Sequence, residues 1–167
     1  MVRHGPAGDK GGWSEAGHPD SERPLTVEGK EFCAQIAQGL ALLVPSLSRI
    51  GVSPFLRARQ TAEELGAVFG IEPEVVTSLA PDGSYDDLNR WVVAGDSVCI
   101  VGHEPYLSGY LATKLSTTAR EALELSKGGA CFIEMEVGSL ERVTWLMKGE
   151  TLAALGRAPG ELALNDE

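Results

Sequence analysis

At 167 residues, of which 43% are hydrophobic, the chain has the size and composition of one globular domain with a single core. Its formal net charge of -10 excludes the basic surface that nucleic acid or an anionic membrane requires, so neither is expected as a partner. No apolar run approaches the roughly 18 residues that a membrane span needs.

The three cysteines, Cys33, Cys99 and Cys131, lie far apart and in apolar surroundings. This spacing favours reduced core residues over a disulfide framework or a metal site. The first residues show no basic region followed by an apolar stretch, so no export signal is expected and a cytoplasmic location is predicted.

The first predicted element is a very short strand that leads into Arg3-His4-Gly5. A histidine at the end of a strand and beside a fixed cation can act as a nucleophile, although the triplet alone is also compatible with an exposed loop histidine. Residues 6–24 are rich in Gly, Pro, Ser and charge, which predicts a long loop of the kind that serves a site. His18 in this loop is expected to be solvated.

A helix is predicted to begin after Thr26, a plausible N-cap, and to end at Pro45. Its apolar residues recur every three or four positions and form one buried stripe: Phe32, Ile36, Leu40 and Leu43. A short strand at 49–52 follows, and residues 53–56 turn the chain into a second helix.

This second helix is predicted over residues 57–69, closed by Gly70. Arg57 stands at its start, where the helix dipole disfavours a cation. Either a bound anion or an ion pair with Glu63 or Glu64 would explain an arginine there.

The second half of the chain continues the alternation of strands and helices. Strands are predicted at 74–77 and 97–101, a turn at 80–84, helices around Tyr85, Leu88 and Val92, at 106–115 and at 117–125, and a hairpin at 130–137 and 140–147. After Gly149 the pattern is weak, and residues 151–167 are predicted to be a C-terminal tail.

Alternating strands and helices predict an α/β fold, a three-layer α/β/α sandwich with a mostly parallel central sheet. Ligands of such sheets gather beyond the carboxyl ends of the strands. His4 and His103 each follow a strand, and Arg57 follows the turn after another. These three residues are therefore expected to converge.

Three blocks carry a resemblance to a known family: Arg3-His4-Gly5, the run Ser53-Pro54-Phe55-Leu56-Arg57-Ala58-Arg59-Gln60-Thr61-Ala62, and Gly102-His103-Glu104-Pro105. In this order and spacing, the sequence resembles the histidine phosphatase, or phosphoglycerate-mutase-like, superfamily. Residues 23–29 and 79–81 are most similar to its SixA-type phosphohistidine phosphatase branch. The resemblance covers residues 1–150, the predicted domain, with a first strand that looks truncated beside the family's full strand.

The resemblance implies that His4 is the nucleophile and that Arg3, Arg57 and His103 form the phosphate pocket, with Gly5 among the substrate-binding residues. A neutral imidazole can attack phosphorus if its other nitrogen donates a hydrogen bond that fixes the tautomer. Arginine forks suit two phosphate oxygens at once. No metal or other cofactor is expected.

Family members that hydrolyse phosphoesters also carry an acid that protonates the leaving group. The candidates here are Asp82, with Asp86 and Asp87 nearby, and Glu104 directly after His103. Asp82 reads equally well as part of a Pro81-Asp82-Gly83 turn. An imidazole leaving group needs no strong acid, so the weakness of these candidates favours a phosphohistidine substrate.

The leading hypothesis is therefore a phosphohistidine phosphatase that acts on a histidine-phosphorylated protein through a phospho-His4 intermediate. A small-molecule phosphomonoesterase and a non-catalytic phosphate-binding domain are the alternatives. Residues 6–10 lack the asparagine that mutases of the family usually place there, which argues against a mutase. The oligomeric state cannot be predicted.

Overall fold

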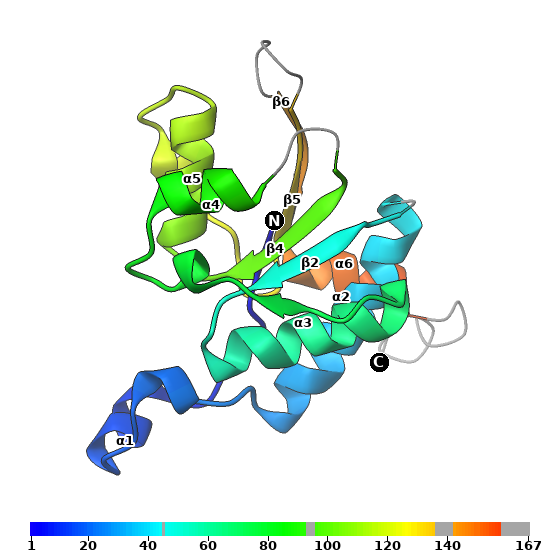
Figure 1. Cartoon of the computed structure of the whole chain (residues 1–167). Helices are drawn as coiled ribbons and strands as arrows, with labels where there is room; N and C mark the ends of the chain where they lie inside the picture. Colours follow the sequence, from blue (N-terminus) through cyan, green and yellow to red (C-terminus); the bar gives the residue numbers. More distant parts are fainter. Residues whose placement is uncertain (45, 93–95, 136–141, 158–167) are drawn as a thin grey trace.

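A six-stranded sheet forms the centre of the computed structural model, which describes residues 1–44, 46–92, 96–135 and 142–157 (Figure 1). The strands are β1 (Val2–Arg3), β2 (Arg49–Val52), β3 (Glu74–Val75), β4 (Val98–Gly102), β5 (Ala130–Glu134) and β6 (Arg142–Met147). The helices are α1 (Lys10–Glu15), α2 (Val27–Leu43), α3 (Leu56–Phe69), α4 (Tyr85–Trp91), α5 (Tyr106–Lys114) and α6 (Gly149–Gly156), with 3-10 turns η1 (Asp20–Glu22), η2 (Thr77–Leu79) and η3 (Arg120–Leu123).

The strand order is β3-β2-β4-β1-β5-β6. The first four strands in this order are parallel, and β5 pairs antiparallel with both β1 and β6. The predicted mostly parallel sheet and the predicted hairpin at its edge are thereby confirmed. The turn of that hairpin, predicted at Gly138 and Ser139, lies outside the described residues.

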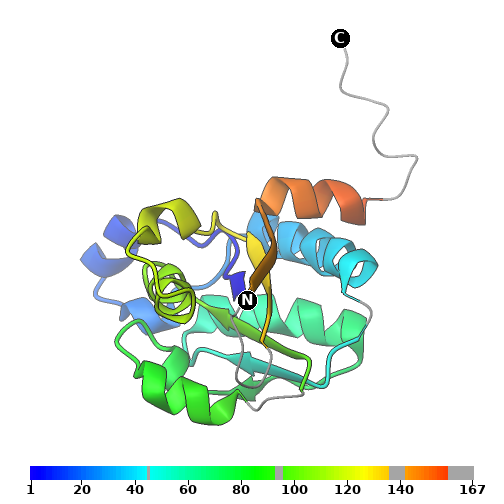
Figure 2. The ribbon, with the colours of Figure 1, turned by 90° about the horizontal axis from the view of Figure 1, so that it is seen from above.

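Helices cover both faces of the sheet and give it three layers. One core cluster joins Cys99 and Val101 of β4 to residues of α2, α3 and α6, while the other joins Ile100 of the same strand to α4 and α5. Neighbouring strand residues point to opposite faces, so the continuous apolar run of β4 is explained by burial on both sides. Figures 1 and 2 show α4 and α5 on one face and α2, α3 and α6 on the other.

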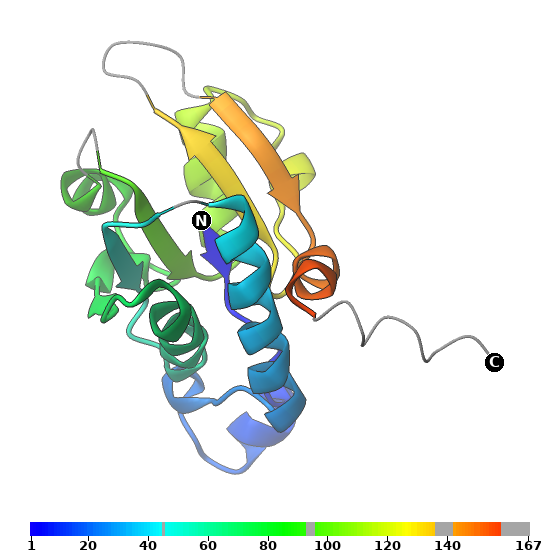
Figure 3. The ribbon, with the colours of Figure 1, turned by 90° about the vertical axis from the view of Figure 1, so that its right-hand side faces the viewer.

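The predicted C-terminal tail is wrong for its first part. Residues up to Gly156 form α6, which packs along α2 (Figure 3) and buries Leu152 and Ala153. The two helices approach so closely that a Cβ on Gly39 would collide with the carbonyl oxygen of Leu152. The apolar pattern of α6 is too short to predict a helix from the sequence, because packing against α2 rather than helix propensity stabilises α6. Residues 158–167 lie outside the described part.

Two further segments differ from prediction. The loop predicted over residues 6–24 contains α1 and η1; Asp9 caps α1 by accepting a hydrogen bond from Gly12 N, and α1 buries no residue, so no apolar period marked it. Residues 117–125 form only η3 instead of the predicted helix. The Leu125 amide there donates to Glu104 Oε1 at 2.9 Å rather than to a helical carbonyl.

Other local predictions are confirmed. Thr26 caps α2 by accepting a hydrogen bond from Gly29 N at 2.9 Å, and the left-handed Gly70, with φ of 70°, ends α3. All three cysteines are free and buried. Within the described ranges, no helix combines the length and apolarity that crossing a membrane demands.

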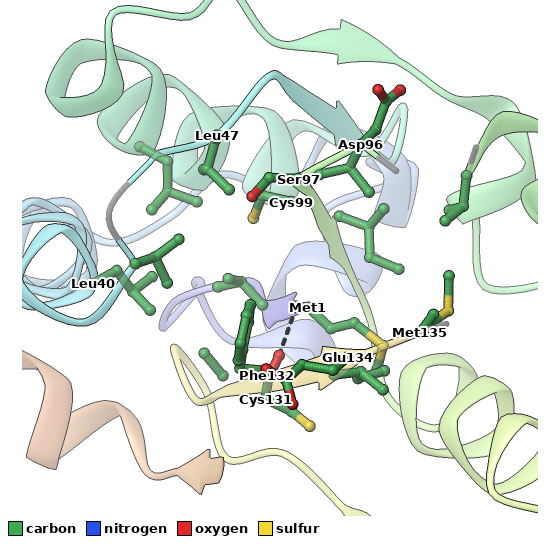
Figure 4. Close-up of a pocket in the computed structure, with 18 of the residues that line it drawn as sticks. Met1, Leu40, Leu47, Asp96, Ser97, Cys99, Cys131, Phe132, Glu134 and Met135 are labelled. Carbon is green, nitrogen blue, oxygen red and sulfur yellow. Dashed lines mark hydrogen bonds between the residues drawn. The ribbon is translucent and has the colours of Figure 1, made fainter. Parts of the chain in front are cut away.

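An apolar cavity of about 380 Å³ lies between β4 and β5, next to Met1 (Figure 4). The amino group of Met1 donates to the Cys131 carbonyl at 2.8 Å beside it, and β1 pairs with only Val101 and Gly102 of β4. Neither His4 nor His103 lines this cavity. This cavity thus lies apart from the two histidines of the predicted site.

Candidate active site

Three side chains meet beyond the carboxyl ends of three adjacent parallel strands. His4 follows β1, Ser53 follows β2 and His103 follows β4. The His4 amide donates to the Gly102 carbonyl and the Ser53 amide to the Val101 carbonyl, each at 3.0 Å, so the backbone fixes where these side chains start. All three are buried, with exposed fractions of 6%, 0% and 3%.

The imidazole of His4 is held in one tautomer. Its Nδ1 lies 2.7 Å from the Gly5 carbonyl oxygen, which can only accept, so the proton is on Nδ1 and Nε2 carries the lone pair. Burial lowers the pKa of His4 to about 3. The hydrogen bond to Gly5 acts to raise this pKa, and the charges of Arg57, Arg3 and Arg23 act to lower it further. His4 is therefore a neutral base at pH 7.

Gly5 holds this histidine in place. A Cβ at this position would collide with Cys33 Sγ, so only glycine fits between β1 and α2. The Gly5 amide donates to Thr61 Oγ1 at 3.1 Å, and that hydroxyl donates to the Arg57 carbonyl at 2.8 Å. The Gly5 amide thus has an acceptor within the protein, and this hydrogen bond helps to hold His4 in position. The predicted contact of Gly5 with substrate stays a prediction.

Arg57 lies in the first turn of α3 and is buried, with 4% of its surface exposed. Its Nε donates to His4 Nε2 at 3.2 Å, the atom with the lone pair. Its two terminal nitrogens donate to Asp20, Nη1 to the backbone oxygen at 2.7 Å and Nη2 to Oδ2 at 3.0 Å. The structure thus pairs Arg57 with Asp20 and not with Glu63 or Glu64, the partners considered from the sequence.

Two more arginines bring positive charge to His4. Arg23 donates from Nε to Asp20 Oδ1 and from Nη1 to the Gly8 carbonyl, both at 2.8 Å. Arg3 donates from Nη1 to the Leu125 carbonyl at 2.6 Å, and its buried Nε has no hydrogen-bond partner among the described residues. A buried donor of this kind is normally satisfied, and an anion would satisfy it.

His103 completes the group. Its ring centroid lies 5.1 Å from that of His4 and 5.0 Å from that of Phe55, and its Nε2 lies 2.7 Å from Ser53 Oγ. Burial, reinforced by His4 and Arg57, lowers the pKa of His103 to about 3. Its buried Nδ1 finds no partner in the described part of the chain. If the Ser53 hydroxyl donates to Nε2, Nδ1 carries a proton that a ligand oxygen can accept.

The arrangement can bind a phosphoryl group and transfer it. A nucleophilic nitrogen lies beside Arg57, and the unsatisfied donors of Arg3 and His103 supply hydrogen bonds for oxygens of a trigonal-bipyramidal phosphorus. No group of His, Cys, Asp and Glu side chains suited to a metal ion occurs within residues 1–44, 46–92, 96–135 and 142–157. The positive charges that act on His4 within these residues are those of Arg57, Arg3 and Arg23.

Neither predicted acid lies ready to protonate a leaving group. Both oxygens of Glu104 are occupied: Oε2 accepts from the Ser108 amide at 3.1 Å and hydroxyl at 2.6 Å, and Oε1 accepts from the Leu125 amide. Glu104 thus ties the start of α5 to the segment after η3. Asp82 is exposed in the turn before α4. His18 is exposed, as predicted, with its ring against Trp13.

Asp20, Ser53 and Thr61 take part in the site without having been predicted to. Ser53 stands directly after a predicted strand, and Thr61 follows Arg57 by one helical turn, so both positions carried a usable signal. Asp20 lies in the irregular segment before Arg23, where no periodicity relates it to Arg57. Arg23 forms an ion pair with Asp20.

The two buried histidines should make the protein less stable in acid. Their pKa of about 3 in the folded state lies below the ordinary 6.5, so the unfolded chain binds more protons between these values. We expect the free energy of unfolding to fall as the pH is lowered from 6.5 to 4.5 in urea titrations. His4→Ala or His103→Gln should flatten this dependence, whereas His18→Ala should leave it unchanged. Equal slopes for all four proteins would contradict the assigned burial.

Comparison with known proteins places these residues in context. A family model described as the histidine phosphatase superfamily, branch 1, matches residues 1–81. An uncharacterised protein of Picosynechococcus sp. is 38% identical over 135 residues, 77% of this chain and 79% of that relative. The phosphohistidine phosphatase SixA of Escherichia coli K12 is 36% identical over 103 residues, 58% of this chain and 63% of that protein.

A solved structure of the protein histidine phosphatase SixA in complex with tungstate is similar across the fold. Its TM-score is 0.71 at 27% identity, and the match covers 90% of this chain and 96% of that one. The likeness therefore extends well beyond the region that the family model matches.

Proposed function

The chain belongs to the histidine phosphatase superfamily, and from this premise we propose that it removes phosphate from phosphohistidine in a protein, through a covalent intermediate on His4. The observation that carries the proposal is the hydrogen bond between His4 Nδ1 and the Gly5 carbonyl, because it fixes the proton on Nδ1 and leaves the lone pair on Nε2, the nitrogen beside Arg57. The similarity to SixA supports the choice of substrate.

In the first step, Arg57 Nε transfers its hydrogen bond from His4 Nε2 to a phosphate oxygen, and the freed lone pair of Nε2 attacks phosphorus in line with the bond to the leaving group. The new P–N bond forms as the P–N bond of the substrate breaks, and its electron pair returns to the substrate imidazole. Arg57, Arg3 and His103 donate hydrogen bonds to the three equatorial oxygens, whose charge they stabilise. The products are phospho-His4 and an unmodified histidine in the partner.

In the second step, water attacks phospho-His4 from the side that the leaving group has vacated. The bond from phosphorus to Nε2 breaks, its electron pair returns to Nε2, and inorganic phosphate leaves with the oxygen of the water. The proton stays on Nδ1 throughout, in its hydrogen bond to the Gly5 carbonyl. His4 therefore begins the next cycle in the same tautomer.

The leaving group distinguishes the candidate substrates. An alkoxide requires a general acid, and the two predicted acids are a structural carboxylate, Glu104, and an exposed turn residue, Asp82. An imidazole whose second nitrogen is protonated leaves as a neutral base without one. The donor set of three cationic or hydrogen-bonding side chains likewise supports a reaction without a metal ion.

The test is phosphate release from a phosphohistidine-containing phosphotransfer protein and from a phosphorylated sugar, with free enzyme at pH 7. We expect kcat/KM to be at least about 100-fold higher for the phosphohistidine protein, because only that leaving group departs without an acid. Adding a chelator should leave both rates unchanged. Faster turnover of the sugar phosphate would identify a phosphomonoesterase, and phosphate binding without turnover of either would identify a non-catalytic domain.

A further inference from the structure

A single carboxylate, that of Asp20, joins two arginines of the phosphate pocket. Its Oδ2 accepts from Arg57 Nη2 at 3.0 Å, its Oδ1 from Arg23 Nε at 2.8 Å, and its backbone oxygen from Arg57 Nη1 at 2.7 Å. The reaction described above assigns it no role. Three hydrogen bonds between η1 and these arginines hold Asp20 in a defined place relative to His4.

Asp20 lies at the outer end of Arg57. The guanidinium of Arg57 contacts His4 through Nε and Asp20 through both terminal nitrogens, so the group separates the nucleophile from the carboxylate. The Arg57 side chain is 5% exposed and that of Asp20 is 35% exposed. The line from His4 through Arg57 to Asp20 therefore runs from the buried end of the site, its base, to the partly exposed end, its mouth.

In-line displacement places the leaving group on the side of phosphorus opposite the nucleophile. His4 is buried, so a leaving group on the far side of phosphorus points toward solvent, and the partly exposed Asp20 lies at the solvent end of Arg57. A phosphohistidine ring bound in this way presents its second nitrogen toward the mouth. Each oxygen of Asp20 accepts from one arginine and keeps a second lone pair, which can accept a hydrogen bond from the N–H of that nitrogen.

This carboxylate is an ion and not an acid. Burial on its own would raise the pKa of Asp20, but the hydrogen bond and charge of Arg23, with those of Arg57, outweigh it and hold the pKa below its ordinary value. Asp20 therefore cannot supply the proton that an alkoxide needs. Its negative charge instead opposes the charge that develops on an oxygen leaving group.

We propose that Asp20 is a specificity-determining residue, which favours leaving groups that carry an N–H donor over those that depart as oxyanions. For phosphohistidine, the carboxylate stabilises the ring with a proton on its second nitrogen; when the P–N bond breaks, the electron pair goes to the first nitrogen and a neutral imidazole leaves. For a phosphoester, the same charge repels the alkoxide or phenolate. The inference rests on the proposed function and assigns its selectivity to one residue.

The experiment measures kcat/KM of Asp20→Asn on a phosphohistidine peptide, on phosphoramidate and on para-nitrophenyl phosphate. Asparagine keeps the size of the side chain and one oxygen acceptor but removes the charge. We expect the ratio of either nitrogen-linked substrate to the phenyl ester to fall about 10- to 100-fold relative to wild type. Asp20→Glu, which keeps the charge, should retain a ratio closer to that of wild type.

Glu22→Gln is the matched control, since Glu22 is an exposed residue of the same turn, and its ratio should equal that of wild type. An equal loss on all three substrates would reduce Asp20 to a support for Arg57 and overturn the inference, as would an unchanged ratio in Asp20→Asn. Thermal unfolding of each variant separates these results from misfolding.

Failure of the proposed function has a different signature. If wild type releases phosphate from phosphoramidate and the phenyl ester but not from the phosphohistidine peptide, the proposed substrate is wrong. The phosphoramidate ratio in Asp20→Asn then still decides the role of Asp20. Inactivity of wild type on all three substrates would overturn both.

Discussion

Replacing His4 with alanine is expected to lower kcat/KM for phosphohistidine by at least about 1000-fold, because it removes the atom that we propose accepts the phosphoryl group. The remaining pocket of Arg57, Arg3 and His103 should still bind inorganic phosphate. The loss should therefore appear in kcat while phosphate continues to protect the variant against thermal unfolding. The measurement is the rate of phosphate release over a range of enzyme concentrations, because high concentrations of His4→Ala make a much reduced kcat measurable.

A second measurement distinguishes a nucleophile from a residue that only binds. Wild-type enzyme quenched in alkali during turnover should contain phosphate bound to one histidine, and peptide mapping should locate it at His4. His18→Ala is the control, because His18 is the remaining histidine outside the site and is exposed. Activity within tenfold of wild type in His4→Ala, or phosphate recovered on another residue, would refute the covalent mechanism.

The sequence predicted the centre of the site because parallel strands bring their carboxyl ends together. His4, Arg57 and His103 each follow a strand within one or a few residues, so topology alone places them near one another. The contact between Arg57 and His4, 53 residues apart in sequence, confirms that reasoning. The predictions of three layers and of reduced cysteines depended on equally local patterns.

What the sequence could not predict depends on contacts between irregular segments. Asp20 reaches Arg57 across 37 residues from a turn without a regular period, and Glu104 reaches the Leu125 amide across 21. Glu104 follows His103 directly, which made it a candidate acid, but adjacent residues at the end of a strand point in different directions. Its carboxylate lies among amides and a hydroxyl, and its role is to hold the backbone.

Replacing Arg57 with glutamine is expected to lower kcat/KM by about 100- to 1000-fold, the second largest effect in the site. Among the described residues, Arg57 is the cation in contact with His4 Nε2, the proposed nucleophile, and a buried charge next to a reacting phosphorus is worth more than an exposed one. Glutamine still donates a hydrogen bond but carries no charge. Most of the loss should therefore appear in kcat, where charge on the transferring phosphoryl group is greatest.

Arg59→Gln is the matched control, since Arg59 lies on the same helix two residues later and is exposed. Its kcat/KM should equal that of wild type, whereas Arg57→Lys should recover only part of the activity, because an ammonium cannot donate to His4 and to Asp20 in the geometry of a guanidinium. Full activity in Arg57→Lys would mean that only the charge matters. A loss in Arg57→Gln confined to KM would mean that Arg57 binds phosphate equally well before and during transfer, and the stabilisation of the transition state would then have to come from Arg3 and His103.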